Sequence, residues 1–405
     1  MTSTSQTQPP AYASRIMFAV TTLIWFSIYS YQSNFTPYLE SLSVSATMIG
    51  LVTGSYGFTQ MILRIPLGIL SDKLKTRKLF IIIGIIFTFL SALLLFATDN
   101  VILILIARAS AGIAASTWVN FTVLFSSYFD ANKSVSSLGF MTFYSNIGQI
   151  GGMIVGAVLI SIVTGIANDG TTRYNSAFML AAIIGVVSFI LSFRIYEDRE
   201  KIAANIKQSI TVRQIFGLFA DKTLISVSVI GAISQLITFG TLLGFTPKYA
   251  VDVLQTNAMQ NGILMVLAYL PTALGALFLS KYLAEKVKEH ILVCVGMILM
   301  AVFTIIIPLI TDYTILVITQ IFAGIGKGIS FPLLMGLSIK KIPEEKRGTA
   351  MGIFQAVYGI GMFMGPLLMG IISDVFELNL SFVVLGSACL VTAVISYFLL
   401  KKLKL

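Results

Sequence analysis

The chain has 405 residues, of which 57% are hydrophobic and only 11% are charged, and its formal net charge is +10. Soluble domains carry roughly 25% charged residues, so this composition excludes a soluble protein and indicates one that spans a membrane. The single histidine, the two cysteines and the lack of a GxxxxGK[ST] loop exclude a clustered metal site and ATP hydrolysis. We therefore expect no enzyme activity, no metal and no cofactor.

Apolar segments recur along the whole chain, and each is close to the length of about 20 residues that a helix needs to cross a bilayer. The polar tail 1–14 precedes the first of them, and no small-residue cleavage pattern follows, so we expect the first segment to be retained as a span. Twelve membrane-spanning helices are expected, at 15–38, 46–70, 78–97, 101–127, 134–164, 176–195, 222–246, 257–283, 290–311, 313–340, 347–373 and 379–400.

The longest connection, 196–221, is expected to be a cytoplasmic linker between an N-terminal bundle, 15–195, and a C-terminal bundle, 222–400, which a tail follows at 401–405. The bundles echo each other in sequence. "SAGIAA" (110–115) lies 212 residues before "FAGIGK" (322–327), and Gly148 and Gly152 lie 213 residues before Gly361 and Gly365. The expected fold class is therefore all-α, with twelve transmembrane helices in two pseudo-symmetric six-helix bundles. Such a layout places a solute site near the middle of the membrane, between the bundles.

Positive charges in the connections predict the orientation of the chain. If both termini are cytoplasmic, the cytoplasmic segments hold 22 of the Lys and Arg residues and the opposite side holds two, Arg173 and Lys248. This bias is what the positive-inside rule expects. We predict a multi-pass protein of the plasma (inner) membrane, whose basic residues face lipid headgroups and cytoplasm and bind no nucleic acid.

Two motifs resemble those of the major facilitator superfamily. The connection between spans 2 and 3 is similar to its cytoplasmic signature, a glycine, an acid and a basic cluster, carried here by Gly68, Leu70, Asp72, Lys73, Arg77 and Lys78. Arg108 and Gly112 in "RASAGIAAS" resemble the second motif of its twelve-helix drug and solute efflux branch. The resemblance implies the major facilitator fold and transport by alternating access. Two departures are Lys75, at a position where the family usually has glycine, and a fifth span without the proline that often marks exchangers.

The resemblance also implies a gate at the cytoplasmic surface. In the family, the acid of the first motif meets the N-terminus of span 11 and favours the outward-facing state, so we expect Asp72 to do so near 343–352. Lys73 and Arg77 are expected to pair across the same surface, and Gly68 begins the motif. Arg64, eight residues before Asp72, could belong to the gate or to the solute site. The alternative is that the basic residues only set the topology.

Three cations lie inside the predicted spans: Arg64, Arg108 and Lys327. All 17 acidic residues fall in loops or at helix ends, so no buried carboxylate is available to pair with them. A charge at the centre of a membrane helix costs about 2.5–3.5 kcal/mol and usually marks a pathway or a partner. We predict that Arg108 and Lys327 together bind the negative part of a solute. The alternatives are an arginine that braces neighbouring helices and a lysine that reaches toward the interface.

Polar and aromatic residues near the middle of the spans extend this site. They suit an amphipathic molecule with hydrogen-bonding groups, although each alone is more often a contact between helices. The further substrate-binding candidates are Gln32, Trp118, Asn120, Asn146, Gln149, Gln235, Tyr269, Gln355 and Tyr358.

The sequence thus predicts a monomeric secondary transporter of a small organic solute that is anionic or amphipathic. Its partners are that solute, the lipid bilayer and a coupling ion, either a proton or a counter-anion. Proton-coupled multidrug efflux is the alternative within transport. A lipid flippase and a non-transporting membrane sensor are alternatives of another class.

Overall fold

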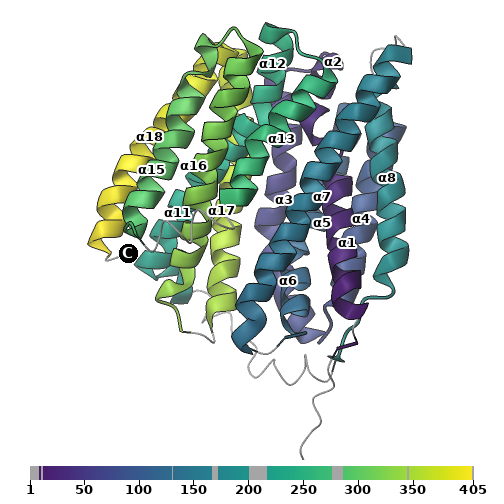
Figure 1. Cartoon of the computed structure of the whole chain (residues 1–405), viewed down its shortest axis with the longest axis vertical. Helices are drawn as coiled ribbons and strands as arrows, with labels where there is room; N and C mark the ends of the chain where they lie inside the picture. Colours follow the sequence, from purple (N-terminus) through teal and green to yellow (C-terminus); the bar gives the residue numbers. More distant parts are fainter. Residues whose placement is uncertain are drawn as a thin grey trace, which may run out of the picture.

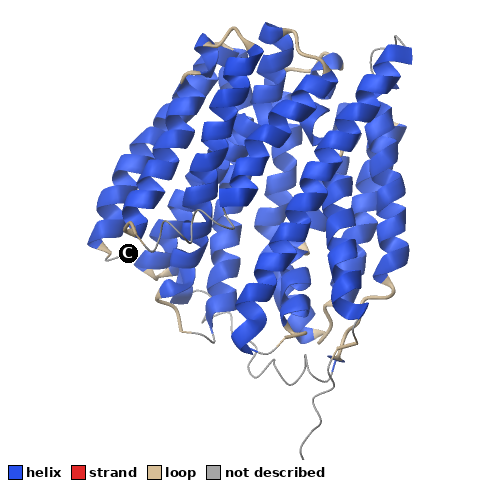
Figure 2. Cartoon of the chain, in the orientation of Figure 1, coloured by secondary structure: helices blue, strands red, loops and turns tan. Residues whose placement is uncertain are grey.

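The computed structural model describes residues 9–10, 12–129, 131–166, 172–199, 217–275, 286–343 and 346–403, with the backbone alone for 131–138 and 172. These residues form helices joined by short loops (Figure 2). Ten helical units among them are long and apolar enough to cross a membrane. The predicted all-α membrane fold is confirmed.

The described helices of the first half of the chain follow one another from residue 12 to residue 192. They are α1 (Tyr12–Tyr29), η1 (Gln32–Asn34), α2 (Phe35–Ser41), α3 (Ala46–Lys73), α4 (Lys78–Ala97), α5 (Val101–Ser116), α6 (Trp118–Ser126), α7 (Ala131–Ile166) and α8 (Thr172–Ser192). The second half holds α11 (Lys222–Ile237), η2 (Thr238–Phe245), α12 (Thr246–Leu254), α13 (Ala258–Leu274), α15 (Glu289–Ile305), η4 (Ile307–Leu309), α16 (Tyr313–Lys340), α17 (Arg347–Val375) and α18 (Leu378–Lys402). The predicted end of the eighth span, 276–283, lies outside the described residues.

The helices run alongside one another, and α1 begins on the same side of the bundle as α18 ends (Figure 1). We call this side the terminal side and the opposite one the far side. Because successive spans alternate in direction, α3 runs toward the terminal side and α17 runs away from it. These two antiparallel helices make the largest contact between the halves.

The first, fourth and seventh predicted spans are interrupted. The first breaks into α1, η1 and α2, the fourth breaks at Thr117, and the seventh contains the π-helical segment η2. Pro37 and Pro247 lie just after the breaks in the first and seventh spans, and a proline offers no amide hydrogen to the carbonyl four residues before it. At the fourth, the Thr117 hydroxyl donates to the carbonyl oxygen of Ala114 at 2.7 Å, which competes with the helical ladder.

The glycines that repeat in the sequence occupy equivalent places in the two halves. Gly148 of α7 packs on the Thr22 carbonyl of α1, and Gly361 of α17 packs on the Ala232 carbonyl of α11. A Cβ atom at either glycine would overlap that carbonyl oxygen. Each glycine therefore permits close approach of the same pair of helices in its own half.

Candidate functional site

A cavity of about 400 Å³ lies between the halves. Elements α1, α3, α6 and α7 line it from the first half, and α11, η2, α13, α16 and α17 line it from the second. The structure brings together here most of the side chains expected to bind substrate, namely Trp118, Asn146, Gln149, Gln235, Tyr269, Lys327, Gln355 and Tyr358.

Lys327 reaches the cavity from the middle of α16. Its side chain is 6% exposed, and its Nζ lies 5.6 Å from the centre of the Tyr269 ring. Among the described residues, no hydrogen-bond acceptor and no carboxylate contacts this ammonium group. A buried charge whose neighbour is an aromatic face can still accept a negatively charged partner.

Arg64 is the second cation that lines the cavity. It is 5% exposed and donates from α3 to Gln60 of the same helix. It also donates across the halves to Tyr358 and, at 3.2 Å, to the Oε1 of Gln355, both on α17. Its Nε is buried without a partner in the described part of the chain. The lining of the cavity includes Arg64 and Lys327 but no aspartate or glutamate among its described residues.

Arg108, which the sequence predicts to bind the solute together with Lys327, does not line this cavity. It is 1% exposed, and its guanidinium lies 4.5 Å from the centre of the Tyr56 ring. It donates to the Tyr31 hydroxyl at 3.3 Å and to the Gln32 Oε1 at 2.6 Å. Arg108 therefore braces the break in the first span, and Gln32 is its partner and not a lining residue.

The motif between spans 2 and 3 is folded within the first half. Arg77 pairs with Asp72 and also contacts Asn120 of α6, at 3.4 Å from its Oδ1. Asn120 of α6 thus contacts this connection and does not line the cavity. In this structure the Asp72 carboxylate meets Arg77, whereas we expected it at the start of α17.

Further hydrogen bonds and one left-handed residue fix the backbone of the same connection. The side chain of Glu197 accepts from the amides of Arg77 and Lys78 and caps α4. The Gly68 carbonyl accepts from Arg77 at 3.5 Å, and Lys73 is exposed. Lys75 has a φ of 51°, so a lysine adopts here the left-handed conformation that a glycine adopts more easily.

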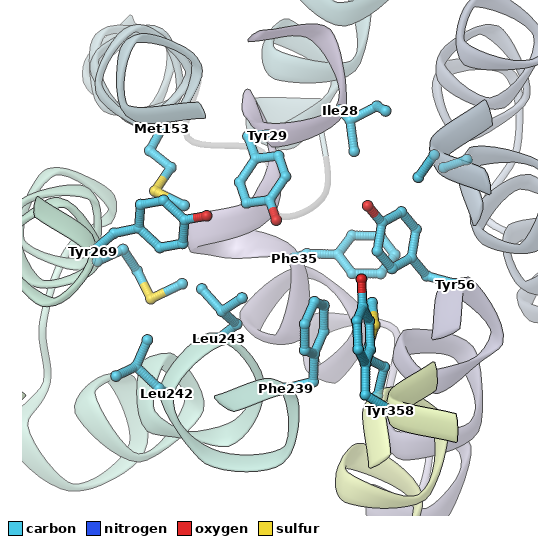
Figure 3. Close-up of a cluster of buried hydrophobic side chains, with 14 of the residues drawn as sticks. Ile28, Tyr29, Phe35, Tyr56, Met153, Phe239, Leu242, Leu243, Tyr269 and Tyr358 are labelled. Carbon is cyan, nitrogen blue, oxygen red and sulfur yellow. The ribbon is translucent and has the colours of Figure 1, made fainter. Parts of the chain in front are cut away.

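Aromatic residues that the sequence did not single out form much of the cavity wall. They include Trp25 and Tyr29 of α1, Tyr56 of α3 and Phe239 of η2. Figure 3 shows the hydroxyl groups of Tyr29 and Tyr269 pointing toward each other, with Tyr358 directed toward Tyr56. Trp25 and Tyr29 lie four residues apart, so a helical face could have linked them, but no sequence feature separates them from packing residues.

Hydrogen bonds between the halves close the far side. Gln32 Nε2 donates to the Leu243 carbonyl at 3.1 Å, and the Thr36 hydroxyl donates to the Gly244 carbonyl at 2.8 Å. The Leu243 carbonyl has no α-helical donor, because Pro247, four residues later, lacks an amide hydrogen.

Charged groups reinforce this closure. Lys248 pairs with Glu40 of the other half and, at 2.7 Å, with Asp252 of its own helix. On the terminal side, Gly139 and Met335 line the cavity, and a Cβ added to Gly139 would meet no atom of the described residues within 4 Å. The cavity therefore extends toward the terminal side and is shut on the far side.

Comparison with known proteins finds a family profile and relatives that are similar to this chain over most of its length. A sequence profile described as the Major Facilitator Superfamily matches residues 17–280 and 227–404. An uncharacterized MFS-type transporter of Methanocaldococcus jannaschii is 25% identical over 373 residues, 90% of this chain and 92% of that protein. The proton-coupled antiporter flippase LtaA of Staphylococcus haemolyticus is 25% identical over 366 residues, 89% of this chain and 87% of that one.

A solved structure shows the same fold. A bacterial homolog of the human lysosomal transporter Spinster, inward-facing and unoccupied, superposes with a TM-score of 0.77 at 16% identity, covering 96% of this chain and 97% of that one. The profile match, the helical bundle and the cavity between two halves agree. The chain belongs to the major facilitator superfamily, whose members are secondary transporters and not enzymes.

Proposed function

We propose that the chain moves a small organic solute that carries a negative charge on an amphipathic body. The solute binds in the central cavity, with its charged group between Lys327 and Arg64. The observation that carries this proposal is a cavity lined by two cations and, among its described residues, by no carboxylate.

The charge argument follows from the cost of burial. Two cations away from water are costly unless an opposite charge lies near them. Arg64 is partly compensated by Gln60, Gln355 and Tyr358, while Lys327 has, among the described residues, only the Tyr269 ring. An anionic solute supplies the missing negative charge, and a cationic solute would add a third positive charge to the same space.

The remaining lining favours an amphipathic solute. Aromatic rings supply apolar area, and the amides of Asn146, Gln149 and Gln235 supply donors and acceptors. Gln149 Oε1 and Gln235 Oε1 are buried without a partner among the described residues, so a solute with hydrogen-bond donors can satisfy them. The volume of about 400 Å³ lies within the range of small-molecule sites, roughly 300–1,000 Å³.

Transport follows by alternating access of the two halves, bounded at 15–195 and 222–400, around this fixed site. The active unit is a monomer in the plasma membrane, with both termini in the cytoplasm, so the terminal side is the cytoplasmic side. The present arrangement is then inward-facing.

A lipid flippase is the second candidate, because relatives that align with 89% of the chain are named proton-coupled antiporter flippases. A lipid with an anionic headgroup satisfies the same charge requirement. A proton-coupled multidrug exporter of cations fits less well, because the described lining offers a cation no carboxylate. If a proton is coupled, it must use Lys327, a helix-end acid such as Glu40, or the solute itself.

A ligand screen tests the charge of the solute directly. Thermal unfolding of the purified protein in a non-ionic detergent is followed with aromatic carboxylates, alkyl phosphates, anionic lipids and lipophilic cations. A ligand that binds only the folded state raises the unfolding temperature. We expect members of the anionic classes to do so, and stabilisation by lipophilic cations alone would overturn the proposal.

Uptake and flipping assays then separate the two candidates. Proteoliposomes are loaded with the stabilising soluble anion, or with a fluorescent anionic lipid, with and without a pH gradient. Movement of the lipid without movement of the soluble anion identifies a flippase. A requirement for the gradient that Glu40→Gln or Lys327→Ala abolishes identifies the proton-carrying group.

A further inference from the structure

The far-side start of α3 is held by a carboxylate from the other half. Asp374, next to last in α17, accepts from the amide of Ala46 at 2.9 Å and from the amide of Thr47 at 2.8 Å. The Ser45 hydroxyl accepts from the amide of Met48 at 3.2 Å. The first three unpaired amides of α3 are therefore all satisfied, two of them by the opposite half.

The terminal-side ends of the same two helices have the same parts, but they are not in contact. Asp72 is next to last in α3, and α17 begins at Arg347 on the same side of the bundle. Asp72 pairs with Arg77, and the side chain of Lys346, the N-cap residue of α17, makes no capping hydrogen bond. The antiparallel pair thus has an aspartate at each C-terminal end, and each aspartate is on the side where the other helix starts.

The spacing of the two helices differs sharply between these ends. On the far side, a Cβ atom added at Gly370 would overlap the Ala46 carbonyl, and one at Gly50 would overlap the Pro366 carbonyl. On the terminal side, a Cβ atom added at Gly68 or Gly348 would meet no atom of the described residues within 4 Å. The close glycine contacts between the two helices are thus found at the end where Asp374 engages, and neither Gly68 nor Gly348 makes one at the end where Asp72 lies.

We propose that Asp374 is a far-side latch that stabilises the present arrangement, and that it alternates with Asp72. The two contacts lie at opposite ends of one helix pair, so a rocking motion that closes one end opens the other. When the far side opens, Asp374 leaves the amides of Ala46 and Thr47, and Asp72 becomes able to reach the start of α17. The proposal rests on alternating access but not on the identity of the solute.

The expected effect of Asp374→Asn on the conformational equilibrium depends on how exposed the Asp374 contact is to solvent. A carboxylate at a helix N-terminus contributes little when solvent screens it, and Asp374 is exposed. Asp374→Asn should therefore raise the ratio of far-side-open to far-side-closed molecules by about two- to fivefold.

Distance measurements between spin labels on the two halves can follow this ratio. The labels are placed by Ser43→Cys and Thr311→Cys, two exposed positions in far-side loops, in a protein in which Cys294 and Cys389 are replaced by serine. Asp312→Asn is the matched control. Asp312 is also an exposed far-side carboxylate that caps a helix, but it accepts from the amide of Ile315 within its own half.

The open population should rise in Asp374→Asn, stay unchanged in Asp312→Asn and not rise in Asp72→Asn. Ala46→Pro tests the contact from the other side, because proline fits the first position of a helix and lacks the amide that Asp374 binds. Its effect should match that of Asp374→Asn in direction and should not add to it. If Asp374→Asn and Ala46→Pro both leave the population where Asp312→Asn leaves it, Asp374 is only a helix cap and the latch is refuted.

The result is separable from the charge of the solute. A shift in Asp374→Asn together with unaltered binding in Lys327→Ala would uphold the latch and remove the anion site. The opposite pair of results would remove the latch alone.

Discussion

Replacing Lys327 with alanine should weaken binding of the solute about ten- to a hundredfold. The ammonium group lies in the cavity, 5.6 Å from the centre of the Tyr269 ring, and no described carboxylate lines that space. A hydrogen bond to a charged group contributes roughly 1.5–3 kcal/mol, which sets the size of the loss. The contact between Lys327 and the Tyr269 ring is present in both the empty and the bound protein. It therefore contributes little to the change in binding free energy on substitution.

The same substitution should not lower the stability of the empty protein. A buried charge with little compensation opposes folding, and its removal relieves that cost. The expected signature of Lys327→Ala is therefore weaker binding with an unchanged or higher unfolding temperature. Lys327→Arg keeps the charge and should lose less affinity than the alanine variant.

Isothermal titration calorimetry with the organic anion that most stabilises the parent protein measures the change. Lys340→Ala is the matched control, because Lys340 lies on the same helix but is half exposed and pairs with Glu289 outside the cavity. It should bind within twofold of the parent. If Lys327→Ala also binds within twofold, the ammonium group does not hold the solute and the charge argument is wrong.

Three further substitutions test other parts of the structure. Arg64→Lys should reduce affinity about tenfold in the same titration, because a point charge cannot keep the contacts of the guanidinium fork on both halves. Arg108→Met should lower the free energy of unfolding by about 1–3 kcal/mol, since it leaves a buried amide oxygen unpaired, yet affinity should stay within twofold. A loss of affinity with intact stability would return Arg108 to the solute site. Gly361→Val should abolish the monodisperse peak in size-exclusion chromatography, whereas Gly348→Val, which faces open space, should not; equal behaviour would contradict the packing argument.

The helical bundle could be predicted from the sequence because each span is encoded by its own apolar segment, and such segments recur along the chain. Apolar segments of membrane-spanning length are visible without knowledge of their neighbours. The breaks were harder to predict, yet they carried a signal. "FTP" occurs at 35–37 and again at 245–247, 210 residues later. Each copy lies within an interrupted span, at the start of the helix that follows the break.

The cavity could be predicted only in part, because burial alone does not say which space a side chain faces. Arg108 in the fourth span and Lys327 in the tenth look alike in sequence, because each is a cation inside an apolar helix. Gln32 lies far from Arg108 in the chain and reaches it only through the folded bundle. Arg64 lies closer to a helix end in the sequence. In the folded protein its guanidinium donates to Gln355 of α17, and the side chain lines the cavity.

Pro247 has a consequence for the open state of the far side. In the present arrangement the Leu243 carbonyl accepts from Gln32 of the opposite half. An α-helical rewinding of η2 could not supply a replacement, since the residue four positions on has no amide hydrogen. Once the halves separate, water or a donor group on the solute can take the place of Gln32 at this oxygen. The wall of the far-side entrance therefore carries a polar group that an α-helical rewinding of η2 would leave open to the entering solute.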